Sequence, residues 1–167
     1  MTVTQRGRAL WPQFALLAGA IVVADQVSKT LLVGALRPGE STSVVGDLVR
    51  FVHAQNTGGL FGLFRDGAPV FAIASIGVIA MIAWYHGRSG RSPYMTLTLG
   101  LLLGGAIGNL IDRIAVGRVT DFVVWRYHEH EWPTFNVADV ALCVGVGLLL
   151  LDGGKKKPPA PAKKPAR

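Results

Sequence analysis

The chain contains a long apolar run at residues 94–116, which reads YMTLTLGLLLGGAIGNLIDRIAV. Within these 23 residues only Asp112 and Arg113 are charged, and both lie near the end of the run. A helix rises about 1.5 Å per residue, so a helix of this length crosses a hydrocarbon core of about 30 Å. Lipid cannot satisfy exposed backbone groups, and the run lacks the alternation of a barrel strand. We therefore expect a membrane-spanning helix.

Three further apolar runs occupy residues 14–36, 68–86 and 135–151. The first is interrupted only by Asp25 and Lys29, the second lacks Asp, Glu, Lys and Arg, and the third carries Asp139 near its start. The sequence thus predicts an all-α membrane protein with four transmembrane helices, forming one domain over residues 1–152. Residues 153–167 are rich in Lys and Pro with little to bury, so we expect a disordered basic cytoplasmic tail.

Composition supports a membrane protein and excludes several function classes. Half of the residues are hydrophobic and 16% are charged, against about 25% in soluble domains. The net charge of +7 comes mostly from the tail, so we expect no nucleic-acid partner. The single cysteine, Cys143, cannot form an internal disulfide or a thiolate metal site.

The positive charges on the loops predict the orientation of the helices. Basic residues gather before the first run, between the second and third runs, and after the fourth. The other two loops, residues 37–67 and 117–134, hold five basic and six acidic residues. Because Lys and Arg are retained in the cytoplasm, we expect both termini inside and these two loops outside.

The first outer loop also carries a strand signal. Residues 41–55 read STSVVGDLVRFVHAQ, two β-prone runs around Gly46 and Asp47. This pattern is typical of a hairpin. We expect a small β-sheet in the outer loop between spans one and two.

Ionisable residues inside a span are costly, so each is a functional candidate. Asp25 and Lys29 lie four residues apart on one helical face, where they can simply neutralise each other. Asn109, Asp112 and Arg113 form a polar stripe near the outer end of the third span. Such a stripe must face the bundle, where it can pair internally or hold a ligand.

The predicted orientation brings two aspartates to one membrane level. Asp121 follows the third span by five residues, and Asp139 lies about one turn inside the fourth. If the two are adjacent, charge repulsion makes them share a proton, so that one acts as a base and the other as an acid. The alternative is a pair of separate, solvated interfacial carboxylates. His128 and His130 flank Glu129, but two histidines without a third spaced ligand are a weak metal signal.

Five motifs in order are similar to those of a known family. They are DQVSK at residues 25–29, NTGGLF at 56–61, GGAIGNLIDR at 104–113, GRVTDF at 117–122 and WPTFNVAD at 132–139. Together they resemble signal peptidase II, the bacterial lipoprotein signal peptidase family of membrane aspartyl proteases. Two departures are Gly59-Leu60, where small Ala or Ser residues are commoner, and Thr120, where Val is usual.

The resemblance implies roles for particular residues. It implies that Asp121 and Asp139 are catalytic, that Asn56, Asn109, Arg113 and Asn136 line the substrate site, and that Asp25, Lys29 and Asp112 support it. It also implies that the enzyme uses no metal or organic cofactor. The implied reaction removes the signal peptide of diacylglyceryl-modified prolipoproteins, with cleavage just before the lipidated cysteine. We expect a multi-pass monomer of the bacterial inner membrane, in contact with lipid, with its active site at the outer face.

Two other classes remain as alternatives. A small proton-coupled transporter would also carry Asp, Lys and Arg in a bundle, but it needs a polar path through both leaflets. A non-catalytic membrane scaffold would explain a small bundle with a basic tail. It gives no reason for Asn, Asp and Arg at one depth.

Overall fold

The structure, a computed structural model, describes residues 10–57, 68–89 and 92–153. The predicted tail and residues 58–61 of the second motif lie outside these ranges. Within them the helices are α1 (Trp11–Ala35), α2 (Ala68–Ser89), α3 (Pro93–Val116) and α4 (Val137–Gly153). The strands are β1 (Ser41–Val45), β2 (Val49–Asn56), β3 (Val119–Tyr127) and β4 (His130–Glu131). All four predicted apolar runs are helical.

Three of these helices, α1, α2 and α3, are long and apolar enough to cross a membrane. The fourth, α4, has 17 residues and is shorter. Large apolar side chains such as Leu16 on α1 and Ile73 on α2 are more than 70% exposed. A helix surface of this kind would be unfavourable in water and is favourable in lipid.

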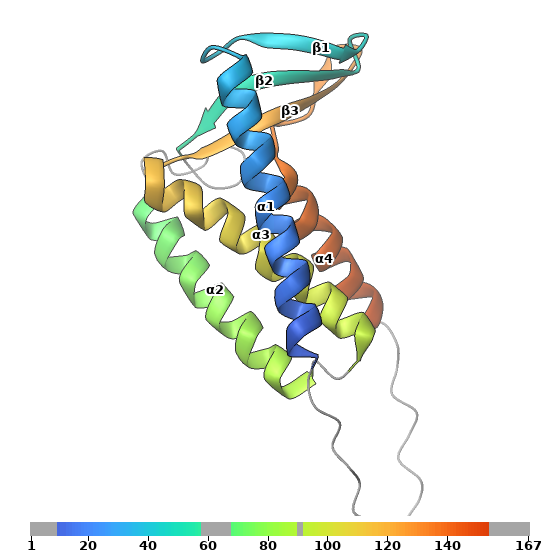
Figure 1. Cartoon of the computed structure of the whole chain (residues 1–167). Helices are drawn as coiled ribbons and strands as arrows, with labels where there is room; N and C mark the ends of the chain where they lie inside the picture. The colour runs from blue at the N-terminus through green and yellow to red at the C-terminus, as the bar shows by residue number, and fades with distance from the viewer. Residues whose placement is uncertain (1–9, 58–67, 90–91, 154–167) are drawn as a thin grey trace, which may run out of the picture.

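Helix α3 forms the centre of the bundle, with α1, α2 and α4 packed around it (Figure 1). Glycines let two of these neighbours approach closely. A Cβ on Gly105 would lie 2.5 Å from the carbonyl oxygen of Ala138 on α4, and one on Gly108 would lie 2.7 Å from a carboxylate oxygen of Asp25 on α1. Close approach at these two glycines brings polar groups of three helices within hydrogen-bonding distance of each other.

An antiparallel four-stranded sheet of order β1-β2-β3-β4 covers one end of the bundle (Figure 1). The hairpin predicted around Gly46 is present as β1 and β2. The prediction of an all-α protein with a small sheet between spans one and two is thus confirmed in its four helices and its hairpin, and is wrong in the class, because the four-stranded sheet makes the fold mixed. Strands β3 and β4 come from the loop between α3 and α4. They belong to the same sheet as the hairpin because β3 pairs with β2 over most of its length.

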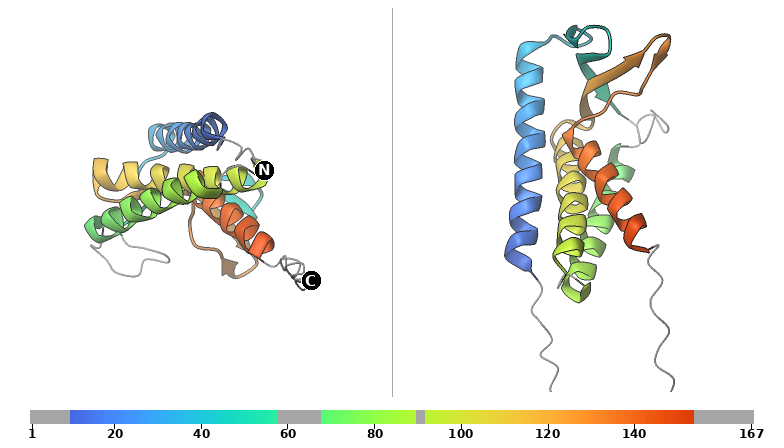
Figure 2. Two further views of the ribbon diagram at one scale, coloured as in Figure 1. Left: turned by 90° about the horizontal axis from the view of Figure 1, so that it is seen from below. Right: turned by 90° about the vertical axis from the view of Figure 1, so that its right-hand side faces the viewer.

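Two local features place the start of α4 beside β3. Gly117 ends α3 in the left-handed conformation, with φ of +69°, and the chain turns directly into β3. The backbone of Phe135, just before α4, bonds to β3 in both directions: its N–H donates to Val123, and its carbonyl oxygen accepts from Phe122 and Val123. Figure 2 shows β3 and the start of α4 at the sheet end, where α1 and α3 also end.

Candidate active site

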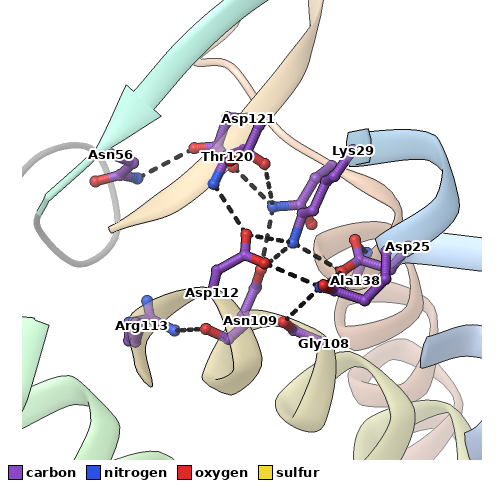
Figure 3. A network of polar contacts seen from close by, with 12 residues as sticks. Asp25, Lys29, Asn56, Gly108, Asn109, Asp112, Arg113, Thr120, Asp121 and Ala138 are labelled. Atoms are coloured by element: carbon purple, nitrogen blue, oxygen red, sulfur yellow. Dashed lines mark hydrogen bonds and ion pairs between the residues drawn. The ribbon is translucent and has the colours of Figure 1, made fainter. Parts of the chain in front are cut away.

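A buried ion cluster joins α1 to α3 just below the sheet (Figure 3). The ammonium of Lys29 lies 2.7 Å from Asp25 and 2.9 Å from Asp112, and all three side chains are at most 8% exposed. The predicted pairing of Asp25 with Lys29 is therefore present. Lys29 also donates to the side-chain oxygen of Asn109. One cation thus orients two carboxylates and an amide.

The two carboxylates of this cluster also hold backbone groups at the sheet end. Asp25 accepts a hydrogen bond of 3.0 Å from the backbone N–H of Ala138, in the first turn of α4. Asp112 accepts one of 3.0 Å from the backbone N–H of Thr120 on β3. Asp25 therefore acts as an N-terminal cap supplied by another helix. The cluster fixes both chain segments that lead to Asp121 and Asp139.

Asn136 connects the two candidate aspartates. Its backbone N–H donates to Asp139, and its side-chain oxygen accepts from the backbone N–H of Asp139, at 3.1 and 3.0 Å. This reciprocal arrangement is a capping box at the start of α4. The side-chain NH₂ of Asn136 donates to Asp121 over 2.7 Å. A single fully buried side chain thus contacts both aspartates.

Further amides complete the surroundings of the two carboxylates. Asn56 at the end of β2 donates to the second oxygen of Asp121 over 3.2 Å. Asn109 on α3 donates to the second oxygen of Asp139 over 2.8 Å. All four aspartate oxygens therefore accept from neutral N–H groups. Neutral donors orient a carboxylate without binding its charge as tightly as a salt bridge does.

The pKa of Asp121 is raised to about 6. Burial is the largest cause, because removal from water disfavours the charged form, and the negative charge of Asp139 adds to it. The hydrogen bonds from Asn56 and Asn136 act in the opposite direction. Near neutral pH the Asp121 carboxyl is thus close to the point at which it gains or loses a proton.

The two aspartates border a cavity of about 240 Å³ at the sheet end of the bundle. Its remaining walls come from β2, α3, α4 and the segment before α4. They include Asn56, Asn109, Arg113, Trp132, Pro133, Thr134, Phe135 and Cys143. The Arg113 guanidinium lies 5.7 Å above the ring of Phe71 on α2 and donates to the carbonyl oxygen of Asn109. The cavity therefore offers carboxylates, amides and one cation in an apolar frame.

The structure brings the predicted site residues together in two layers. Asp121, Asp139, Asn56, Asn109, Arg113 and Asn136 are at the cavity or bond directly to its aspartates, and Asp25, Lys29 and Asp112 lie behind them. Among the described residues, no group of three or more His, Cys, Asp or Glu side chains could hold a metal ion.

Sequence reasoning gave no role to Gln26. Its side-chain NH₂ donates to Asp112 over 2.9 Å and to the carbonyl oxygen of Gly108 over 3.2 Å, which links α1 to α3. Gln26 lies directly after Asp25, inside the first motif. A polar side chain within this apolar run was the signal that could have predicted a contact between helices.

Comparison with known proteins shows the family to which this chain belongs. The model of the family described as signal peptidase (SPase) II matches residues 17–153. The chain belongs to the signal peptidase II family. The match covers α1 from Leu17 onward, the other three helices, the sheet and every motif quoted above.

Named relatives agree with this family. The lipoprotein signal peptidase of Symbiobacterium thermophilum is 39% identical over 136 residues, covering 81% of this chain and 90% of that protein. The enzyme of Syntrophotalea carbinolica is 40% identical over 141 residues, covering 81% and 87%. That of Pseudomonas putida is 39% identical over 158 residues, covering 90% of each.

Solved structures agree as well. One described as a bacterial membrane enzyme, determined by the in meso method at 2.3 Å resolution, has a TM-score of 0.82 and 27% identity, and covers 96% of this chain and 98% of its own. A second, at 1.9 Å resolution, has a TM-score of 0.82 and 26% identity, and covers 90% and 97%. This member of the signal peptidase II family is thus a multi-pass bacterial membrane enzyme.

Family membership gives the chain the activity of a lipoprotein signal peptidase, an aspartic endopeptidase of the membrane. The predicted enzyme class is confirmed. The transporter and scaffold alternatives are not supported, because the family model spans the whole bundle and its relatives are peptidases.

Lys29→Met tests the supporting cluster. The variant removes the cation and leaves Asp25 and Asp112 buried without an ionic partner, which we expect to cost about 3–5 kcal/mol of stability. Thermal unfolding in detergent measures the loss. Adding Asp25→Asn to Lys29→Met removes one of the two unpaired charges and should recover part of it. Unfolding of Lys29→Met at the wild-type temperature would contradict this role.

Proposed function

We propose that Asp121 and Asp139 are the catalytic pair of this peptidase, and that its substrate is a diacylglyceryl-modified prolipoprotein cleaved just before the lipidated cysteine. The observation that carries the proposal is the contact of Asn136 with both carboxylates at a shared cavity. The family supplies the aspartic chemistry and the prolipoprotein class. Among the described residues, Asp121 and Asp139 are the two aspartates that border this cavity, so we assign the aspartic protease chemistry to them.

The proposed reaction needs one proton shared by the pair. The ionised carboxylate takes a proton from water as the water oxygen attacks the scissile carbonyl carbon, while the protonated partner gives its proton to the carbonyl oxygen. As the tetrahedral intermediate collapses, the C–N bond breaks and the leaving nitrogen takes a proton from the first carboxyl group. The partner carboxylate takes back a proton from one hydroxyl of the intermediate as the new carbonyl forms, which restores the starting state of the pair. A raised pKa on Asp121 supports this sharing.

The polar side chains around the pair suit an extended peptide. A signal peptide that leaves its helix inside a membrane exposes backbone N–H and C=O groups that lipid cannot satisfy. Asn56 and Asn109 offer amide donors and acceptors beside the aspartates, and Arg113 offers guanidinium donors at the cavity wall. We assign these residues and Asn136 to substrate binding and alignment.

We further propose that all four helices cross the membrane, with the sheet outside and both termini in the cytoplasm. Helix α4, with 17 residues, spans about 25 Å, which crosses the core if its ends reach the interfaces. The distribution of Lys and Arg on the loops supports this orientation.

A reporter fused after Arg167 should stay inaccessible from outside intact cells. Labelling of that reporter from outside would overturn the topology.

Asp121→Asn and Asp139→Asn test the pair. Each keeps the side-chain volume but removes an acid or base, so we expect each to lower cleavage of a lipidated precursor by at least about 10²-fold. Both variants should still insert and unfold cooperatively in detergent. Asp47→Asn, the same substitution at an exposed turn residue, is the matched control and should keep wild-type activity. Substantial activity in either site variant would exclude the pair.

Asn56→Ala tests the effect of the Asn56 hydrogen bond on the pKa of Asp121, measured through the dependence of kcat/KM on pH. In the free enzyme kcat/KM should fall as pH rises above about 6, because the pair then loses its shared proton. The Asn56 hydrogen bond lowers the pKa of Asp121, so its removal should raise that pKa and move the alkaline limb to higher pH. Gln55→Ala, an exposed neighbour on β2, should leave the limb in place. A shift to lower pH would contradict the assignment.

A further inference from the structure

A second recess, of about 270 Å³, opens beside the active-site cavity along α4. We call it the α4 recess. Besides Asp139 it is lined by Trp125, Trp132, Phe135, Val140, Cys143 and Val144. Four residues, Asp139, Trp132, Phe135 and Cys143, line both the recess and the active-site cavity. The two spaces are therefore neighbours with a shared wall that includes a candidate catalytic carboxylate.

The recess follows α4 away from the sheet end. Cys143 lies one turn beyond Asp139, about 6 Å along the helix axis. Val140 and Val144 are 48% and 47% exposed, so this face of α4 is open at the surface of the bundle. Trp125 on β3 and Trp132 before α4 border the same space from the sheet side. Figure 2 shows β3 and α4 on the side of the bundle away from α1.

The lining indicates what kind of group the recess can hold. Apart from Asp139 it consists of aromatic, valine and cysteine side chains, and its surface is almost entirely apolar. A peptide backbone placed there would leave its N–H and C=O groups without partners. A hydrocarbon chain has no such groups and gains by filling the space between these side chains.

We propose that the α4 recess binds part of one acyl chain of the diacylglyceryl group on the substrate cysteine. This inference rests on the proposed function, in which the lipidated cysteine directly follows the scissile bond. Its thioether sulfur then lies a few bonds from the carbonyl carbon held between Asp121 and Asp139. The recess begins at Asp139 and is open on its outer side, so a chain can enter it sideways from the bilayer.

This placement gives the lipid a catalytic consequence. A chain held along α4 fixes the position of the cysteine, and therefore of the scissile bond, relative to the two carboxylates. Binding energy from a part of the substrate that does not react is then used to align the part that does. The recess would make the enzyme selective for the length of the acyl chain as well as for its presence.

Val144→Phe tests the recess by filling it, with Val140→Phe as a second variant one helical turn nearer the sheet end. The matched control is Val78→Phe, the same substitution at an exposed position of α2. Each enzyme is assayed on one precursor peptide carrying either two palmitoyl or two hexanoyl chains. Wild type and Val78→Phe should show the higher kcat/KM on the palmitoyl precursor. The recess variants should lose about tenfold on it, because the scissile bond is no longer aligned by a bound chain, and little on the hexanoyl precursor.

Other results would overturn the inference. Unchanged chain-length preference in both recess variants would mean that no chain occupies the space. An equal loss on both precursors would assign the recess to general alignment of the peptide. If instead the loss disappears when an apolar residue upstream of the cleavage site is replaced by alanine, the recess holds that side chain. Activity in Asp121→Asn would defeat the proposed catalytic pair and is scored separately from all these outcomes.

A second measurement leaves the recess unaltered. Cys143 is the chain's single cysteine and is exposed on the wall that the recess shares with the active-site cavity, so an apolar maleimide reports on the occupation of both spaces. In the Asp121→Asn enzyme, saturating palmitoyl precursor should slow alkylation of Cys143 several-fold. The unlipidated peptide, which occupies the active-site cavity alone, should slow alkylation clearly less than the palmitoyl precursor does. Equal protection by both ligands, or protection by neither, would contradict the proposed acyl-chain site.

Discussion

The buried contact of Lys29 with Asp25 and Asp112 is the interaction on which the arrangement of the site depends. A charge within an apolar bundle is costly unless it is paired, so the three groups are held tightly together. Each carboxylate then uses an oxygen to hold a backbone N–H, one at the start of α4 and one on β3. A pairing required by the membrane thus sets the geometry of the two segments that carry Asp121 and Asp139.

The proposed catalytic pair is surrounded differently from the carboxylates that contact Lys29. Asp25 and Asp112 contact a cation, whereas Asp121 and Asp139 accept hydrogen bonds from the amides of Asn56, Asn109 and Asn136 and from a backbone N–H. A directly bound ammonium would hold the pair in its fully ionised form, but neutral donors allow one proton to remain. The same residue types therefore support the fold in one layer and are suited to acid–base chemistry in the next.

Much of this structure could be predicted from sequence because its signals are local. The apolar runs predicted the helices, and the β-prone runs around Gly46 predicted the hairpin. The cost of intramembrane charge predicted that the stripe of Asn109, Asp112 and Arg113 faces the bundle. Strand β3 was missed because its pairing partner, β2, is more than sixty residues away, and the loop was considered mainly for its charges. The capping box at Asn136 and Asp139 has a local pattern, but its bond to Asp121 depends on how Phe135 pairs with Val123.

The proton shared by Asp121 and Asp139 is the central claim, and direct titration of Asp121 tests it best. Carboxyl carbon chemical shifts of ¹³C-labelled aspartate, followed against pH in detergent micelles, report the pKa of this group. We expect a pKa of about 6 in the wild type, and a lower value in Asp139→Asn, where the neighbouring negative charge is removed. A pKa near the ordinary aspartate value of 3.8 that does not respond to Asp139→Asn would contradict the account.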